Sequence, residues 1–200
     1  MSNDGVNTTR RRFLTAATSV VGAAGAVGVA VPFVGSWNPS AKAKAAGAPV
    51  KFDVSRLEPG EMKVVEWRGK PVYVVRRTAE SLAQLPTLEG SLKDPGSSKV
   101  EQQPAYITGA ERSINPEFVV LVGLCTHLGC APKYRPEVGT VPTSDGSDWV
   151  GGFFCPCHGS MFDLSGRVYT GVPASDNLVV PPHSYENDSV IVIGVDSETA

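Results

Sequence analysis

Two short segments that carry cysteine and histidine constrain this chain more than any other feature. The sequence has four cysteines and three histidines, and all four cysteines and two of the histidines fall within residues 125–158. The first segment reads C-T-H-L-G-C from Cys125, and the second reads C-P-C-H-G-S from Cys155. Because each segment places a thiol and an imidazole close together, we expect the fold to bring two loops around one site.

The residues alone leave the kind of site open. Each segment offers one cysteine–histidine pair and one further cysteine: the pairs are Cys125/His127 and Cys155/His158, and the further cysteines are Cys130 and Cys157. A structural zinc site is one alternative, although zinc sites usually pair cysteine with cysteine and histidine with histidine. Two plain disulfides are another, which leaves both loop histidines unexplained. The third histidine, His183, has no metal-spaced partner and is expected in an exposed loop.

The N-terminal segment predicts a membrane anchor. Residues 13–37 are free of charge and rich in Ala, Val and Gly. As a helix they would reach about 37 Å, enough to cross a hydrocarbon core of ~30 Å. Arg10, Arg11 and Arg12 place residues 1–12 in the cytoplasm by the positive-inside rule, and residues 9–14 resemble the twin-arginine export motif.

A removed signal peptide is the competing interpretation of this segment. Residues 41–43 and 43–45 both have the A-x-A form of a cleavage site. The apolar region of a cleaved signal is only ~7–15 residues long, which favours an uncleaved anchor here. Residues 38–49 are small and low in complexity, and they predict a flexible tether.

Residues 50–200 predict one all-β domain. Runs rich in β-branched and aromatic residues are expected as strands at 62–67, 72–76, 118–124, 149–154, 167–170, 178–180 and 189–193, with one helix at 79–85. Residues 68–71 have the composition of a hairpin turn. The part of the chain after residue 45 has a net charge of −6, which gives no indication of nucleic-acid binding.

The two cysteine–histidine segments together resemble the Rieske signature, and more narrowly that of the quinol–cytochrome c reductase iron–sulfur subunits. Residues 67–71 and 171–174 also follow the order of that family. The resemblance implies an all-β Rieske fold, in which small antiparallel sheets carry a cluster-binding subdomain, with one N-terminal transmembrane helix.

For the site, the resemblance implies one [2Fe–2S] cluster. Cys125 and Cys155 would bind one iron, His127 and His158 the other, and Cys130 and Cys157 would form a disulfide between the loops. His158 would face the quinol and accept its proton. Imidazole ligands in place of two thiolates raise the reduction potential from about −400 mV towards ~−150 to +300 mV.

Residues around the ligands have expected roles too. Ser160 would donate its hydroxyl to a cluster sulfur, and Gly129 and Gly159 would allow the loops to turn tightly. Leu128 would form an apolar docking tip. A covering loop over the cluster is expected from Gly171, Val172, Pro173 and Ala174.

The chain departs from the family pattern at two positions. Phe162 stands where many relatives have a tyrosine whose hydroxyl bonds to a ligand sulfur. Ser175 stands where the covering loop often has another proline, which puts the stiffness of that loop in question.

The resemblance implies an electron-transfer subunit that is not catalytic alone. It would oxidise ubiquinol at a site shared with cytochrome b and reduce a c-type cytochrome, within a dimeric complex. The cluster domain would lie in the periplasm, held by a single helix in the lipid bilayer of the bacterial inner membrane. The Rieske subunit of a molybdenum oxidase of the arsenite oxidase type is an alternative, disfavoured by the long segment 78–114. A soluble ferredoxin is another, disfavoured by the anchor and the additional cysteines.

Overall fold

The computed structural model describes residues 5, 7–141, 143 and 149–196, and it divides into two compact units, Met1–Ala45 and Ala46–Ala200. The first unit contains helix α1 (Thr8–Gly35), whose N-terminus is capped by the Asn7 side chain. At 28 residues, α1 extends about 42 Å, and it is long and apolar enough to cross a membrane. The helix begins before the predicted anchor and therefore includes the three arginines.

A second short helix lies in the segment predicted to be a tether. Helix α2 (Ala41–Ala46) has no buried residue, so packing does not hold it in place. The carbonyl of Ala46 accepts a hydrogen bond from the Arg68 N–H at 3.0 Å, where the second unit begins. The flexibility of residues 38–49 stays a prediction.

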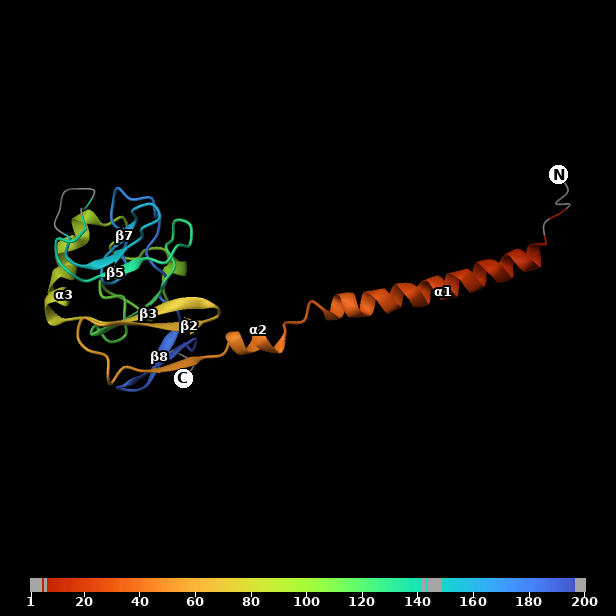
Figure 1. Ribbon diagram of the computed structural model, residues 1–200, viewed down its shortest axis with the longest axis horizontal. Helices are drawn as coiled ribbons and strands as arrows, with labels where there is room; N and C mark the ends of the chain where they lie inside the picture. Colours follow the sequence, from red (N-terminus) through yellow and green to blue (C-terminus); the bar gives the residue numbers. More distant parts are fainter. Residues whose placement is uncertain (1–4, 6, 142, 144–148, 197–200) are drawn as a thin grey trace. The chain divides into compact units, whose positions relative to one another are not determined.

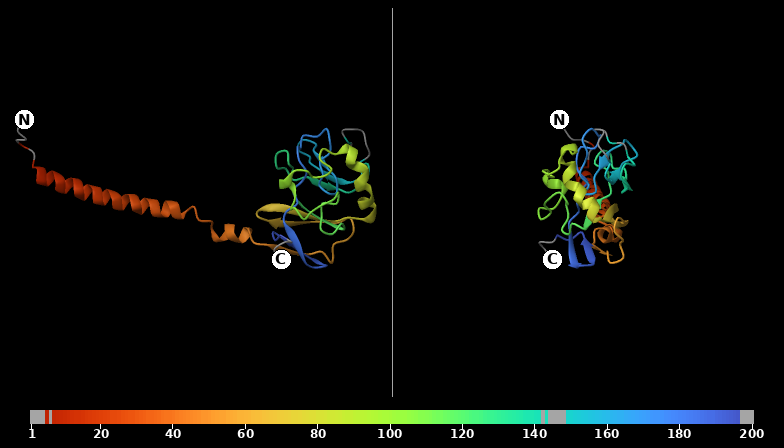
Figure 2. Two further views of the ribbon diagram at one scale, coloured as in Figure 1. Left: turned by 180° about the vertical axis from the view of Figure 1, so that it is seen from behind. Right: turned by 90° about the vertical axis from the view of Figure 1, so that its left-hand side faces the viewer.

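The second unit consists of three antiparallel three-stranded sheets in the described part of the chain, which confirms the predicted all-β class. The strands are β1 Val50–Asp53, β2 Met62–Trp67, β3 Lys70–Arg76, β4 Phe118–Val122, β5 Lys133–Arg135, β6 Gly152–Phe154, β7 Met161–Phe162, β8 His183–Asn187 and β9 Val190–Ile193. Their orders are β1-β9-β8, β2-β3-β4 and β5-β6-β7. Figures 1 and 2 show the β2-β3-β4 sheet between the other two.

Strands β3 and β4 of the middle sheet are buried on both faces because an apolar cluster lies on each side of them, whereas the edge strand β2 is partly exposed. Along β3, Val72 and Val74 belong to the cluster that includes Ile191 of β9. The alternate residues Tyr73 and Val75 belong to the opposite cluster, which also contains the cysteines of the site. Successive side chains of a strand point to opposite faces, so a sheet covered twice requires apolar residues at every position. This requirement accounts for the unbroken apolar runs in the sequence.

The β2–β3 hairpin has the predicted turn. Arg68 and Gly69 have φ values of 52° and 69°, and Trp67 pairs with Lys70 across the turn. Two central residues with positive φ define a type I′ turn, whose twist matches that of the strands.

The predicted helix at 79–85 is confirmed as α3 (Ala79–Gln84), with a capping box between Thr78 and Ser81. Two 3₁₀ helices follow, η1 (Leu85–Ser91) and η2 (Val100–Gln102).

The predicted strands at 167–170 and 178–180 are wrong. Side chains and tight turns satisfy the backbone there instead of a ladder. The Val168 N–H donates to Asn177 Oδ1 at 2.8 Å, and the Leu178 N–H donates to the Gly166 carbonyl at 2.7 Å. Only isolated bridges, Leu92–Tyr169 and Phe162–Val168, remain in the described part of this segment.

A buried charged network replaces the missing ladder. Arg167 and Asp163 form an ion pair at 2.7 Å with both side chains fully buried. Arg112 donates to the carbonyls of Ser165 and Leu178 at 2.9 Å, and Arg77 donates to the Ser165 hydroxyl at 2.8 Å. Three buried guanidiniums therefore share the neighbourhood of one buried carboxylate.

Burial sets the protonation of two of these arginines. It lowers the pKa of Arg77 and of Arg112 to about 10, and the carboxylate of Asp163 opposes the change. Both guanidiniums stay charged at neutral pH because that value lies well above 7.

The expectation for His183 is wrong, because the residue is fully buried at the start of β8. Its Nδ1 lies 2.9 Å from the Pro181 carbonyl, and a carbonyl can only accept, so Nδ1 carries the proton. Nε2 has no hydrogen-bond partner among the described residues. Burial lowers the pKa of His183, so the neutral imidazole is the form that the fold accommodates.

The fold should therefore lose stability in mild acid through His183. An unfolded histidine takes up its proton near pH 6.5, whereas the buried one does so only at a lower pH. Its contribution is complete above about pH 6.5 and declines as the pH falls towards the folded pKa, by at most about 1.4 kcal/mol per pH unit. Urea unfolding at pH 7.5 and 5.5 checks this expectation: His183→Gln should show a smaller loss than the wild type. Equal losses in both proteins would contradict it.

Candidate metal centre

Two loops with the same closing pattern carry the cysteines and histidines. We call residues 125–130, after β4, cluster loop 1, and residues 155–160, after β6, cluster loop 2. In cluster loop 1 the Cys125 N–H donates to the Cys130 carbonyl at 2.7 Å, and the Gly129 N–H donates back to the Cys125 carbonyl at 2.9 Å.

Cluster loop 2 repeats this pattern. The Cys155 N–H donates to the Ser160 carbonyl at 2.8 Å, and the Gly159 N–H donates to the Cys155 carbonyl at 3.0 Å. Gly129 and Gly159 have φ values of 79° and 78°, a conformation that residues with a Cβ rarely adopt. Both glycines thus occupy the tight turns that the sequence predicts for them.

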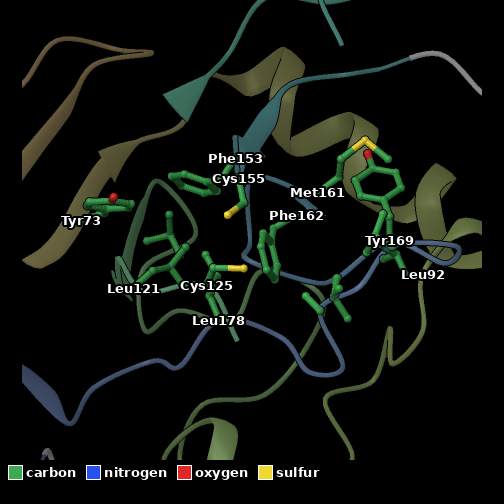
Figure 3. Close-up of a cluster of buried hydrophobic side chains, with 14 of the residues drawn as sticks. Tyr73, Leu92, Leu121, Cys125, Phe153, Cys155, Met161, Phe162, Tyr169 and Leu178 are labelled. Carbon is green, nitrogen blue, oxygen red and sulfur yellow. The ribbon is translucent and has the colours of Figure 1, made fainter. Parts of the chain in front are cut away.

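The fold brings the two predicted cysteine ligands into contact with each other, and likewise the rings of the two predicted histidine ligands. Cys125 and Cys155 are free and buried, and Figure 3 shows their sulfur atoms facing the same space beside Phe162. The rings of His127 and His158 lie 4.8 Å apart, nearly perpendicular to each other. His158 is exposed and His127 is half-buried, so the site runs from buried thiols to accessible imidazoles.

The remaining two cysteines form the predicted disulfide. The bond joins Cys130 of cluster loop 1 to Cys157 of cluster loop 2. The sulfur of Cys155 lies within 4.8 Å of both disulfide sulfurs, so the bridge borders the site. Because Cys130 and Cys157 are bonded to each other, Cys125 and Cys155 are the thiols left to bind metal.

The donor set fits a [2Fe–2S] cluster of the Rieske type, which uses two cysteines and two histidines. Burial raises the pKa of the Cys155 thiol, and contact with Cys125 adds to the rise. The Cys155 thiol would therefore stay protonated on its own, whereas a bound metal ion holds a ligating cysteine as the thiolate. Two thiolates and two imidazoles also suit zinc, so the donor types alone do not decide between the two metals.

The surroundings of the thiols are apolar and closed. Phe162 is fully buried beside the two sulfurs. The covering loop, residues 171–174, buries the side chains of Val172 and Ala174 in the same apolar cluster as the cysteines. The Ala174 N–H donates to Ser160 Oγ at 3.0 Å, which leaves the serine hydroxyl proton available to another acceptor.

Several residues that support the site were missed from the sequence. The ring of Tyr73 lies against Gly123, where an added Cβ would come within 2.4 Å of it, and the Tyr73 hydroxyl donates to the Pro132 carbonyl. The Thr126 hydroxyl donates to the Asp176 carbonyl at 2.6 Å, which links cluster loop 1 to the segment after the covering loop. Lys93 also contacts the covering loop. A strand residue, a glycine and a distant lysine carry no local signal of such a role.

Both parts of the chain match families of known proteins. Residues 49–182 match the family described as "Rieske [2Fe-2S] domain". Residues 1–40 match the family described as "Ubiquitinol-cytochrome C reductase Fe-S subunit TAT signal". Fold, donor set and family match together define a Rieske [2Fe–2S] protein with an N-terminal twin-arginine signal region.

Relatives of known identity narrow this class. The ubiquinol-cytochrome c reductase iron-sulfur subunit of Allochromatium vinosum is 59% identical over 200 residues, which cover 100% of this chain and 95% of that protein. The subunit of the same name from Blastochloris viridis is 41% identical over 194 residues, 96% of this chain and 97% of that protein. A chain of the solved structure titled "Hyperthermophilic respiratory Complex III" is 25% identical, with a TM-score of 0.48, and covers 88% of this chain and 98% of that chain.

The chain belongs to the family of ubiquinol–cytochrome c reductase iron–sulfur subunits. It is thus the Rieske subunit of an enzyme complex that takes electrons from ubiquinol. This finding decides against the molybdenum oxidase, soluble ferredoxin, zinc and plain disulfide alternatives.

Proposed function

We propose that Cys125, Cys155, His127 and His158 hold the cluster, and that His158 faces the quinol. When bound, the cluster supplies a one-electron acceptor whose histidine ligation raises its potential. The observation that supports this arrangement is the gradient of exposure across the four donors. The thiols are buried in an apolar cluster, whereas His158 is exposed and His127 only half-buried.

The accessible imidazole is suited to take up the proton of the quinol. A histidine that binds metal through one ring nitrogen keeps the other nitrogen free to hold or release a proton. On exposed His158 that second nitrogen would accept the quinol proton at the site shared with cytochrome b. Because the thiols lie in the apolar cluster behind the covering loop, the side of the iron–sulfur cluster away from His158 would be closed to water.

The anchor and the tether give this domain its place and reach. Residues 1–12 would lie in the cytoplasm, residues 13–37 would cross the bacterial inner membrane uncleaved, and the domain would lie in the periplasm, where a disulfide is stable. Residues 38–49 would let the domain move from cytochrome b to the c-type cytochrome of a dimeric complex. Export of a folded domain suits a protein whose cluster is inserted before it crosses the membrane.

A redox titration of the full chain in detergent, followed by EPR across a pH series, tests the ligand set. We expect a rhombic signal with an average g value below that of an all-cysteine cluster. The midpoint should fall as the pH rises into the alkaline range, because a ligand histidine then loses its proton. A spectrum with the average g value of an all-cysteine cluster, or a midpoint that does not change with pH, would overturn the proposed ligand set.

The docking role of Leu128 has a matched control in the same domain. Leu128, at the tip of cluster loop 1, is 71% exposed, and Val138 is 70% exposed outside the cluster loops. Placing a charge in an apolar docking contact costs at least about 1.4 kcal/mol, so Leu128→Glu should slow quinol oxidation by the complex about tenfold or more. Val138→Glu should leave the rate near that of the wild type. Equal rates for the two variants would remove the docking role.

Because Phe162 has no hydroxyl, we expect the midpoint potential of the cluster to be lower than in relatives that have a tyrosine at this position. Adding that hydroxyl should raise it. Phe162→Tyr places a donor beside the buried sulfurs, and a bond that favours the reduced state by about 1 kcal/mol raises the midpoint by about 40 mV. Phe52→Tyr adds the same group to the apolar cluster on the opposite face of the middle sheet and should change nothing. The EPR titration measures both variants. An unchanged midpoint in Phe162→Tyr would contradict the expectation.

A further inference from the structure

The covering loop is held from outside by a lysine far away in the sequence. Lys93 Nζ donates to the carbonyl of Val172 at 2.7 Å and to the carbonyl of Ala174 at 2.6 Å, and both bonds are partly buried. These are the two loop residues whose side chains are buried in the apolar cluster with Cys125 and Cys155. The ammonium therefore fixes the backbone of the residues that cover the thiols.

The backbone of Lys93 is itself anchored, so its side chain extends from a fixed point. The Lys93 N–H donates to the Val168 carbonyl at 3.0 Å, and the preceding Leu92 is buried and bridges to Tyr169. The Thr170 N–H donates to the Ser91 carbonyl at 2.8 Å. The segment around Lys93 thus runs beside the chain that leads into the covering loop.

Three contacts together hold the covering loop closed. Lys93 holds its carbonyls, Ser160 Oγ of cluster loop 2 accepts the Ala174 N–H, and Thr126 of cluster loop 1 binds the carbonyl of Asp176 just beyond the loop. Charge-assisted hydrogen bonds are about twice as strong as neutral ones, so the lysine is the strongest of the three. Ser175 stands where the covering loop of relatives often has a proline and does not stiffen the backbone. The lysine bonds stiffen the loop instead.

We infer that Lys93 is a positioning residue of the cluster site, whose ammonium keeps the covering loop closed and whose positive charge favours the reduced cluster. Only the second part of this inference, the effect of the charge on the cluster, rests on the proposed ligand set. Reduction adds negative charge to the site, and a cation bound to the backbone of the covering loop stabilises the form with more negative charge. The closing of the loop depends on hydrogen bonds that exist whatever metal is bound.

Hydrogen exchange and redox titration of the full chain in detergent test the two halves separately. In Lys93→Met, the amides of Gly171, Val172, Ala174 and Ser175 should exchange at least about tenfold faster than in the wild type, because both charge-assisted bonds are lost. The midpoint should be lower. Lys93→Arg should restore both properties, because a guanidinium keeps the charge and offers several donors. Lys70→Met, which removes an exposed lysine beside the β2–β3 turn, should change neither.

A second variant separates hydrogen bonding from charge, and it is also available if Lys93→Met fails to fold. Lys93→Gln keeps a donor but not the charge, so its loop amides should exchange more slowly than those of Lys93→Met, while its midpoint is lowered as much. Exchange by residues 70–76 of the middle sheet reports whether each variant is folded.

Unchanged exchange in Lys93→Met would overturn the positioning role, and an equal fall of the midpoint in Lys70→Met would overturn the local effect of charge. A wild type without the expected EPR signal would instead refute the ligand set, and the exchange data would still decide the role of Lys93 in the loop.

Discussion

Replacing Cys155 with alanine is expected to leave the chain without iron and to reduce quinol oxidation by the complex to background. Cys125 and Cys155 are the two free thiols, and both are buried in the apolar cluster beneath the covering loop. Under the proposed ligand set, one iron would lose one of its two protein ligands, and the fully buried Phe162 beside the gap offers no donor in its place. Iron and sulfide content per chain, with the EPR spectrum, measures the loss.

The disulfide provides the matched control, because its removal takes away two cysteines without removing a ligand. Cys130→Ala combined with Cys157→Ala should still bind iron. The bridge spans 27 residues, and loss of such a closed loop lowers the free energy of unfolding by about 3–4 kcal/mol. Iron at the wild-type level in Cys155→Ala would contradict the ligand assignment.

Replacing Asp163 with asparagine is expected to destabilise the domain by about 3–5 kcal/mol, because it leaves buried guanidiniums without their carboxylate. One oxygen of Asp163 accepts Arg167 Nε at 2.7 Å, and the other accepts the N–H groups of Ser165 and Arg167 at 2.9 and 2.8 Å. An asparagine amide would place a donor against a donor at the first position. Urea unfolding measures the change.

Three buried guanidiniums share one buried carboxylate, so removing a cation should cost less than removing the anion. Arg167→Met leaves Asp163 near two other buried cations, Arg77 and Arg112, so it should destabilise the domain less than Asp163→Asn does. Glu117→Gln breaks a half-exposed pair with Arg76 and should change the free energy of unfolding by less than about 1 kcal/mol. A larger loss in Arg167→Met than in Asp163→Asn would contradict the proposed balance of charge.

The parts of the fold that the sequence predicts correctly are those where one local pattern decides the structure. The β2–β3 hairpin follows from two β-rich runs and a turn that needs positive φ, and the middle strands follow from apolar runs that two covered faces require. Strands β5 and β7 have three and two residues, too few to show any periodicity. They are strands because each pairs with one side of β6 in the folded chain.

The errors fall where polar groups are buried. From a single sequence, a charged or titratable residue is expected to be exposed, but Arg167 and His183 are both fully buried. Arg167 is accommodated because a carboxylate four residues away pairs with it, and His183 because one proton satisfies the Pro181 carbonyl. The sequence alone does not identify these partners, because they meet only in the folded chain.

The two loops of the site could be located from the sequence, but the residues that support the site could not. Both cluster loops are contiguous in sequence, so their cysteines, histidines and glycines identify themselves. The contact of Lys93 with Ala174 joins residues 81 positions apart. Contacts of that separation depend on the path of the whole chain and leave no pattern in a single sequence.

The pairing of the first strand of the domain with its last gives the molecule a mechanical joint. β1 is the edge strand of its sheet and pairs with β9, from Val50 opposite Ile193 to Asp53 opposite Val190. Tension that enters through the N-terminal segment meets the hydrogen bond between Ala46 and Arg68, in the turn of the β2–β3 hairpin, and then this four-residue ladder. The partner strand β9 follows all the other described strands in the sequence, so the joint can bear load only after those strands have been synthesised.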